Sequence, residues 1–407
     1  MNFDAAFLRA QFPILATKAR GKPLVYLDSG ASSQMPQAVI DAVTAHETTS
    51  RANVLRGIHY LAEAATTAFE GARAKVARHI NVADPDEIVF TSGTTAGINL
   101  VAYAFGSTLK EGDEIVVSML EHHSNIVPWQ LLHDRAGIVL KVLPVTDEGR
   151  LDLSDLDTIV TDRCRLIAVT HASNVTGAVT DVRALANAAQ GVGAKLLLDG
   201  AQSVQHGPVD VPSLGCDFYA FSGHKTYAPN GIGVLWARKD MLEEMPPFLG
   251  GGEMIRSVSF DKTTYAKVPH KFEAGTPPIA QAVGLGAAVE WLTDMDWNGA
   301  ASHEARLTGR LLDGLGALKG TRLLGPSDLQ GRLGIVSFDV AGVHPHDVCQ
   351  VLDGHGVAVR GGHHCAQPLM DHFDLTGTTR ASLTFYNTDS DIEALLTGLD
   401  DAVRRLA

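Results

Sequence analysis

Cysteine is scarce in this sequence, with four residues among 407. Cys164, Cys216, Cys349 and Cys365 include no C-x-x-C pair, and their spacing does not resemble a disulfide framework. Small secreted domains that depend on disulfides are therefore excluded. We expect the protein to work in a reducing cytoplasm.

Long apolar runs and an excess of positive charge are also missing. No stretch is long and apolar enough to span a bilayer, and residues 1–20 lack the apolar run and cleavage pattern of a signal peptide. The 33 Lys and Arg against 46 Asp and Glu give a formal net charge of -13. Because nucleic acids and anionic membranes bind clustered basic residues, we expect neither as a partner. A soluble protein that handles a small molecule is the better expectation.

Short β-branched runs alternate with helical stretches through the middle of the chain. We predict strands at 87–90, 114–117, 138–142, 166–169, 195–198, 215–221 and 231–237. This alternation is typical of an α/β protein whose mostly parallel sheet is flanked by helices on both faces.

The pattern changes after about residue 295. A long amphipathic helix is followed by a strand near 334–340 and by helices that begin at 347 and 389. A smaller C-terminal α/β domain fits this pattern. We therefore expect a large domain of residues 26–294 and a small domain of residues 1–25 and 295–407.

Three polar segments follow predicted strands, where α/β sheets bind their ligands. Lys225 ends the segment Ser222-Gly223-His224-Lys225, and a lysine there can form a Schiff base. Asp199 ends another strand, where a carboxylate can keep a pyridine nitrogen protonated. The loop 91–97 joins a strand to a helix and can bind a phosphate. Each segment alone also fits a surface lysine, a helix cap or a bare turn, but together they indicate a pyridine phosphate cofactor.

The chain resembles the cysteine desulfurases over nearly its whole length, and specifically the group II branch associated with SUF-type iron–sulfur assembly. These are fold-type I pyridoxal-phosphate enzymes of the class V aminotransferase-like group. The motifs that carry the resemblance are 56–59 (RGIH), 91–99 (TSGTTAGIN), 121–129 (EHHSNIVPW), 199–202 (DGAQ), 222–225 (SGHK), 272–277 (FEAGTP) and 360–368 (RGGHHCAQP). Agreement across seven separate motifs is not a coincidence of composition.

The resemblance implies a set of contacts to pyridoxal 5'-phosphate. Lys225 is expected to hold the cofactor covalently, and His123 to stack over its ring and shuttle protons. The other expected cofactor contacts are Thr94, Thr95, Asn174, Asp199, Gln202, Ser222, His224 and Thr276. Thr276 matches a residue that reaches the phosphate in the neighbouring subunit, so the resemblance also implies a homodimer.

The expected substrate of this family is L-cysteine. By resemblance, Arg380 grips its carboxylate, and Asn174, Arg360 and Arg56 are further substrate contacts. Relatives are expected to carry histidine before Arg56, whereas this chain has Leu55. Any polar contact that the family makes at that position is therefore not expected to carry over, and the core chemistry does not depend on it.

Cys365 is the expected sulfur acceptor. Its thiolate would attack the substrate sulfur, leaving L-alanine and a persulfide that is passed on for iron–sulfur cluster assembly. His363, His364 and Arg360 would lower the thiol pKa through their positive charge. The compact segment around Cys365 lacks the longer flexible loop of group I relatives, which predicts low activity without an acceptor protein.

His346 is a further candidate site, although the segment 343–348 also fits a helix cap with incidental histidines. It resembles branch members in which a histidine here takes over a zinc ligand position of a small acceptor. We otherwise expect no metal.

Three alternatives stay open from sequence. An aminotransferase, epimerase or kynureninase-like hydrolase would share the lysine, aspartate and phosphate loop but would not need Cys365. A selenocysteine lyase would carry the same residues. A non-catalytic assembly scaffold would retain only the fold.

Overall fold

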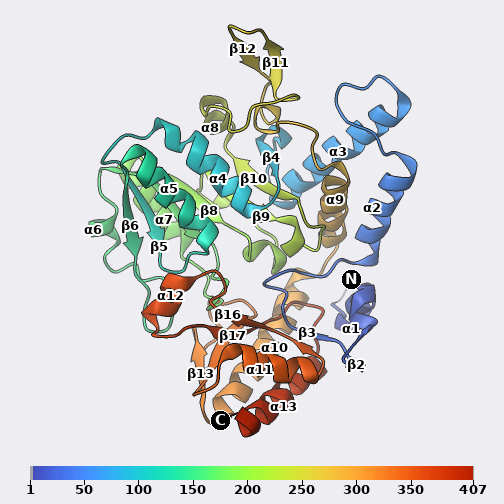
Figure 1. Ribbon diagram of the computed structural model, residues 1–407, viewed down its shortest axis with the longest axis vertical. Coiled ribbons are helices and arrows are strands. Elements are labelled where there is room, and N and C mark those ends of the chain that lie inside the picture. The colour runs from blue at the N-terminus through green and yellow to red at the C-terminus, as the bar shows by residue number, and fades with distance from the viewer. Residues whose placement is uncertain (1–2, 407) are drawn as a thin grey trace.

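A seven-stranded sheet forms the centre of the larger part of the computed structural model, which describes residues 3–406 (Figure 1). The strand order is β4 (Ile88–Thr91), β10 (Gly233–Ala237), β9 (Phe218–Ser222), β8 (Lys195–Asp199), β7 (Cys164–Thr170), β5 (Glu114–Ser118) and β6 (Val139–Leu143). Strand β10 is antiparallel to β4 and β9, whereas the pairs from β9 through β6 are parallel. The predicted α/β fold with a mostly parallel sheet is confirmed.

Two of these strands, β9 and β10, begin two or more residues later than predicted. The prediction started them at 215 and 231, but Gly215 and Gly231 have φ angles of +71° and +79°. Extended strands do not adopt positive φ, so each glycine ends the preceding turn and the strand follows it.

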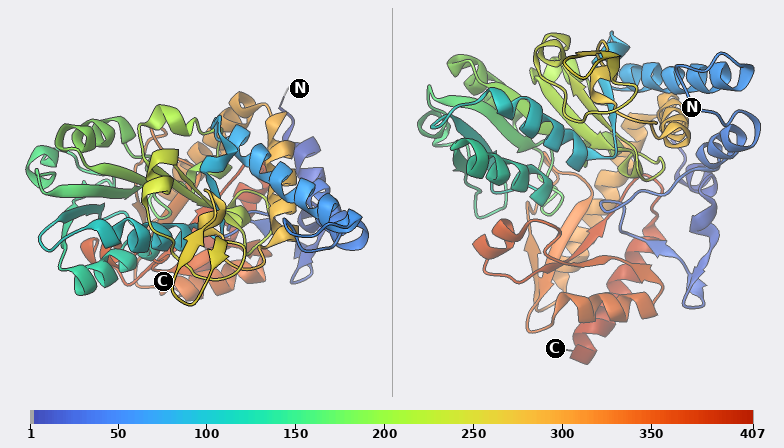
Figure 2. Two further views of the ribbon diagram at one scale, coloured as in Figure 1. Left: turned by 90° about the horizontal axis from the view of Figure 1, so that it is seen from above. Right: turned by 45° about the horizontal axis from the view of Figure 1, so that its top comes forward.

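Helices cover both faces of this sheet (Figure 2). One face packs against α4 (Thr94–Ala104) and α5 (Val127–Ala136), and the other against α3 (Tyr60–His79), α7 (Val182–Val192) and α9 (Ile279–Thr293). In β8, Leu197 belongs to the first core, while Leu196 and Leu198 belong to the second. This period of two is why the central strands are apolar on both sides.

A second, four-stranded antiparallel sheet lies beside the C-terminal helices in the lower part of Figure 1. Its order is β13 (Thr321–Leu324), β14 (Ile335–Val340), β17 (Thr378–Ser382) and β16 (Arg360–Gly362). The helices α10 (Trp297–Ala317), α11 (Pro345–Gly354) and α13 (Asp389–Leu406) pack on it. The N-terminal β3 (Val25–Tyr26) pairs in parallel with β15 (Val357–Ala358), so both ends of the chain contribute to this part.

The remaining elements connect or extend these two parts. They are α1 (Ala5–Ala10), β1 (Lys18–Ala19), β2 (Lys22–Pro23), α2 (Gln37–Thr49), α6 (Leu156–Ile159), α8 (Lys239–Glu244), β11 (Ile255–Val258), β12 (Thr263–Tyr265) and α12 (Gln367–His372). The β11–β12 hairpin projects from the top of the molecule in Figure 1. Between residues 3 and 406, no helix combines the length and the apolar character needed to cross a bilayer.

Candidate active site

A cavity of about 530 Å³ opens where three parallel strands end. Thr170, Asp199 and Ser222, the last residues of β7, β8 and β9, all line it. The predicted residues that line it are Thr94, Thr95, Asn174, Asp199, Gln202, Ser222, His224, Lys225, His346, Arg360, Cys365 and Arg380. Residues from both sheets thus meet at the carboxyl edge of the large sheet, where ligands of α/β folds bind.

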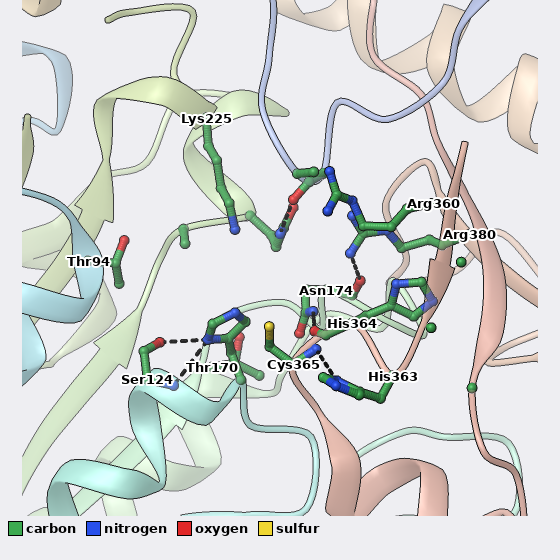
Figure 3. Close-up of a pocket in the computed structure, with 18 of the residues that line it drawn as sticks. Thr94, Ser124, Thr170, Asn174, Lys225, Arg360, His363, His364, Cys365 and Arg380 are labelled. Carbon is green, nitrogen blue, oxygen red and sulfur yellow. Dashed lines mark hydrogen bonds between the residues drawn. The ribbon is translucent and has the colours of Figure 1, made fainter. Parts of the chain in front are cut away.

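Lys225 points into this cavity from a short turn after β9 (Figure 3). Gly223 begins the turn, and a Cβ there would lie 2.7 Å from Ile232 Cγ2, so the approach requires glycine. Burial lowers the pKa of the Lys225 amine to about 8, against the opposing effect of Asp199. A lysine with this pKa is partly unprotonated near neutral pH and can act as a nucleophile or base.

Asp199 offers a buried carboxylate to the same cavity. Its Oδ1 accepts the Ala201 N–H over 2.9 Å, and burial raises the pKa of the carboxyl. A protonated pyridine nitrogen would provide a further positive partner for this buried group, besides the Lys225 amine. Gln202 lies beside it and donates from Nε2 to the Gly30 carbonyl over 2.9 Å.

The part of the cavity lined by Thr94 and Ser222 is suited to a phosphate. Helix α4 begins at Thr94, whose backbone N–H and hydroxyl lie 2.8 and 2.7 Å from Ser222 Oγ. Gly93 and Gly233 are in close contact, since a Cβ on Gly233 would lie 2.4 Å from Gly93 Cα. Burial lowers the pKa of His224 to about 4, so its ring is neutral. A helix N-terminus with hydroxyl groups and a neutral imidazole fits a bound phosphate.

The two adjacent histidines, His122 and His123, differ in their relation to the cavity. His122 lines the cavity, whereas the predicted His123 does not. His122 Nδ1 accepts the Ser124 N–H over 3.1 Å, and burial lowers its pKa to about 3. His122 precedes the turn His123–Asn125 and caps it, which turns its ring inward. The two adjacent histidines have the same side chain, so residue type does not show which ring enters the cavity. Only the capping position of His122 distinguishes them.

His123 instead contacts the segment that carries the exposed thiol. Its backbone N–H donates to the Cys365 carbonyl over 2.7 Å, and its ring Nε2 accepts the Gln367 N–H over 3.1 Å. His123 therefore ties the turn after β5 to the cysteine segment.

Cys365 is the exposed cysteine of the chain, and its thiol points into the cavity that Lys225 also enters (Figure 3). His364 and Cys365 have φ angles of +51° and +56°. The His364 carbonyl accepts from Asn174 Nδ2 over 2.7 Å, and the Cys365 N–H donates to His363 Nδ1 over 3.0 Å. These bonds hold the segment in a strained conformation that aims the thiol at the cavity.

One expected source of positive charge at Cys365 is absent. Burial lowers the pKa of His364 to about 2, so its ring is neutral rather than cationic. The expectation for His364 was therefore wrong, because this side chain is buried against β17 and bonded to Thr378. The positive charge near Cys365 comes from Arg360 and Arg380.

The two arginines share one carboxylate. Arg360 contacts Asp28 through Nε at 3.2 Å and Nη2 at 2.9 Å, and Arg380 Nη2 lies 3.4 Å from the same group. Arg380 is 2% exposed, donates from Nη1 to the Asn174 carbonyl, and has an Nε without a hydrogen-bond partner among residues 3–406. Such a buried, incompletely paired guanidinium suits a substrate carboxylate. Asp28 was not predicted from the sequence, because no local motif marks it.

The other cysteines lie in environments that favour the thiol. Burial raises the pKa of Cys164 and Cys349 to about 11 and that of Cys216 to about 12. These thiols stay protonated at neutral pH, and such groups are poor nucleophiles.

Arg56 and Thr276 do not reach the cavity of their own chain. Arg56 is exposed and forms an ion pair with Glu253 over 3.1 Å. Thr276 lines a separate cavity next to His46 and Arg51. His346 lies at the edge of the main cavity, where a Cβ on Gly361 would come within 3.1 Å of its Cδ2.

The comparisons with known proteins agree with this geometry. The family model described as Aminotransferase class-V matches residues 25–395. A probable cysteine desulfurase of Streptomyces coelicolor is 46% identical over 403 residues, covering 98% of this chain and 96% of that protein. A cysteine desulfurase of Escherichia coli O127:H6 is 46% identical over 408 residues, covering 100% of both.

Solved structures show the same fold. The crystal structure of the cysteine desulfurase CsdA (S-sulfonic acid) from Escherichia coli has a TM-score of 0.92 at 42% identity and covers 100% of both chains. A C-DES mutant with glycine covalently linked to the PLP cofactor has a TM-score of 0.82 at 25% identity, covering 97% of this chain and 99% of that chain.

Proposed function

We propose that Cys365 is the residue that receives the sulfur. The premise is that this chain belongs to the class V aminotransferase family and is a pyridoxal-phosphate-dependent cysteine desulfurase. The observation that carries the proposal is the position of its exposed thiol in the cavity that also holds Lys225. The other three cysteines are buried or half-buried.

The residues divide into a cofactor end and a substrate end. Thr94, Thr95, Ser222 and His224 would hold the phosphate of pyridoxal phosphate, Asp199 its ring nitrogen and Lys225 its reactive carbon. The cofactor, when bound, supplies an electron sink for the negative charge that develops at the substrate Cα. Arg380 lies at the opposite side of the cavity in Figure 3, at a position to bind the substrate carboxylate.

Lys225 is the proposed base for the Cα proton. Its pKa of about 8 lets the amine accept a proton near neutral pH and return it later. The neutral ring of His122, held by Ser124, is proposed to cover the cofactor and to accept or donate a proton on the opposite side.

The transfer of sulfur from L-cysteine requires one cysteine thiol of the protein. The Cys365 thiolate attacks the sulfur of L-cysteine, so an S–S bond forms and the C–S bond breaks. The carbon fragment leaves with the electron pair of that bond and takes up a proton, which makes it L-alanine. Cys365 is left as a persulfide, and a thiol of an acceptor protein would remove the outer sulfur.

We further propose that the protein is a cytoplasmic homodimer of the SUF-type branch. Arg56 and Thr276 lie outside their own cavity, which supports a role for them in the site of a second copy. The tightly bonded segment around Cys365 supports the need for an acceptor protein in iron–sulfur cluster assembly. The four cysteines of the chain form no disulfide, as expected for a reducing compartment.

Two measurements test the function. The holoenzyme should form equal amounts of alanine and sulfide from L-cysteine in the presence of a reductant, and Lys225→Ala should form neither. L-Selenocysteine is the rival substrate, and selenium leaves carbon more readily than sulfur. Cys365→Ala should therefore lose L-cysteine activity far more than L-selenocysteine activity. Equal losses on both substrates would contradict a role for Cys365 in sulfur removal.

A further inference from the structure

Three metal-binding side chains converge at the mouth of the cavity. One ring nitrogen of His123, one of His363 and the Cys365 sulfur all lie within 4.8 Å of one another. No second group of three histidine, cysteine or acidic side chains meets this distance within residues 3–406. We propose that these three side chains form a binding site for a thiophilic metal ion, best matched by Zn²⁺.

The three side chains are already held in place without a metal. The His123 N–H donates to the Cys365 carbonyl over 2.7 Å, and the Cys365 N–H donates to His363 Nδ1 over 3.0 Å. The rings of His123 and His363 have centroids 5.4 Å apart. The left-handed conformation of Cys365, with φ +56°, sets the direction of its Cα–Cβ bond. Little conformational freedom is lost when the site closes on an ion, which favours binding.

The ligand set selects the class of metal. Two imidazoles and a thiolate are typical ligands of Zn²⁺ and of other borderline or soft ions, whereas Mg²⁺ and Ca²⁺ require oxygen ligands. Each ring already accepts one backbone N–H, at His123 Nε2 and His363 Nδ1. A metal must take the other nitrogen, with a shift of the ring proton, or displace that N–H. Either change breaks one hydrogen bond per ring, and a hydrogen bond is weaker than a metal–ligand bond.

Metal binding would compete with sulfur transfer. The bound sulfur can no longer attack the substrate. Three protein ligands leave a fourth position, and Cys365 and His363 line the cavity, so water or the thiolate of L-cysteine can fill it. The site therefore takes the enzyme out of turnover reversibly. Only this effect on turnover rests on the proposed role of Cys365; the ion binding itself does not.

The test is a Zn²⁺ titration of the holoenzyme against a chromophoric chelator, without L-cysteine. Wild type should bind one Zn²⁺ per chain, and His123→Asn, His363→Asn and Cys365→Ser should each weaken binding by more than ~10-fold. Cys349→Ser and His372→Asn are matched controls outside the cluster and should keep the wild-type affinity. Cofactor absorbance and thermal unfolding of every variant show whether it is folded.

A second probe identifies the sulfur ligand directly. Co²⁺ in place of Zn²⁺ should give a sulfur-to-metal charge-transfer band in wild type that is absent from Cys365→Ser. No Zn²⁺ binding by wild type, or wild-type affinity in His123→Asn or His363→Asn, would overturn the proposed site. If Cys365→Ser loses Zn²⁺ but desulfurates normally, the metal site stands and the sulfur-acceptor role falls.

Discussion

The side-chain amide of Asn174 donates to the backbone carbonyl of His364 over 2.7 Å, across 190 residues of sequence. The Asn174 carbonyl in turn accepts from Arg380 Nη1 over 2.9 Å. One asparagine therefore links the segment that carries Cys365 to the arginine proposed to bind the substrate. This link holds the Cys365 segment in position relative to Arg380.

Replacing Asn174 should loosen that link. In Asn174→Ala the His364 carbonyl loses its buried donor, and we expect kcat/KM for L-cysteine to fall by about 10-fold or more, equivalent to ~1.4 kcal/mol. Hydrogen exchange of residues 363–366 should become faster. Asn187→Ala, an exposed site on α7, is the control and should change neither. Unchanged exchange in Asn174→Ala would show that the bond does not restrain the segment.

His122 and His123 should respond differently to substitution. His122→Ala removes the ring inside the cavity and should shift the cofactor absorbance and lower kcat by at least ~10²-fold, as expected for a lost acid–base group. His123→Ala should leave the absorbance of the bound cofactor unchanged, because its ring faces the cysteine segment. A spectral shift confined to His123→Ala would restore the original sequence assignment.

His364 should make the fold sensitive to acid. Its pKa is about 2 in the folded protein against 6.5 for an unperturbed histidine, so its contribution to stability is complete above pH 6.5 and is lost as pH falls toward 2. This difference corresponds to about 2 kcal/mol at pH 5. In urea unfolding, His364→Asn should therefore lose less stability between pH 7 and pH 5 than wild type. Equal losses would mean that His364 is not buried in its neutral form.

His346 tests the proposed contact with an acceptor protein. It lies at the edge of the cavity, next to Gly361, where an incoming partner would reach Cys365. We expect His346→Ala to lower the ratio of acceptor-stimulated to basal activity. His372→Ala, on α12, is the matched control and should keep the wild-type ratio. If both rates of His346→Ala fell in proportion, a structural role would explain the loss instead.

Much of the fold was accessible from sequence because its signals are local. Central strands such as β7 and β8 are apolar on both faces, and the cofactor motifs follow strand ends directly. The late start of β9 and β10 was not predicted, because a glycine at positive φ leaves no signal that separates a turn from a strand. The division into residues 26–294 and residues 1–25 with 295–407 stays a prediction.

The site was predicted less completely, because its details depend on distant contacts. Asp28 binds Arg360 and Arg380 across more than three hundred residues, and no spacing rule reveals such a pair. The neutral state of His364 depends on its burial against Thr378. The inward turn of His122 depends on the capping of one short helical turn. In each case residue type was informative, but orientation came only from the tertiary structure.

The central claim is that Cys365 receives the substrate sulfur. Cys365→Ala should keep its cofactor absorbance and lose at least ~10²-fold in desulfuration, about the effect of deleting an activated nucleophile. The loss should persist when an acceptor protein is present, because the acceptor has no persulfide to draw on.

Mass spectrometry after a short pulse of L-cysteine tests this claim most directly. In the wild-type holoenzyme, digested without reductant, the peptide that contains Cys365 should gain the mass of one sulfur atom. Peptides with Cys164, Cys216 or Cys349 should gain none, because those thiols are buried or half-buried and have raised pKa values. An added sulfur on any of these three peptides, with none on the Cys365 peptide, would contradict the account.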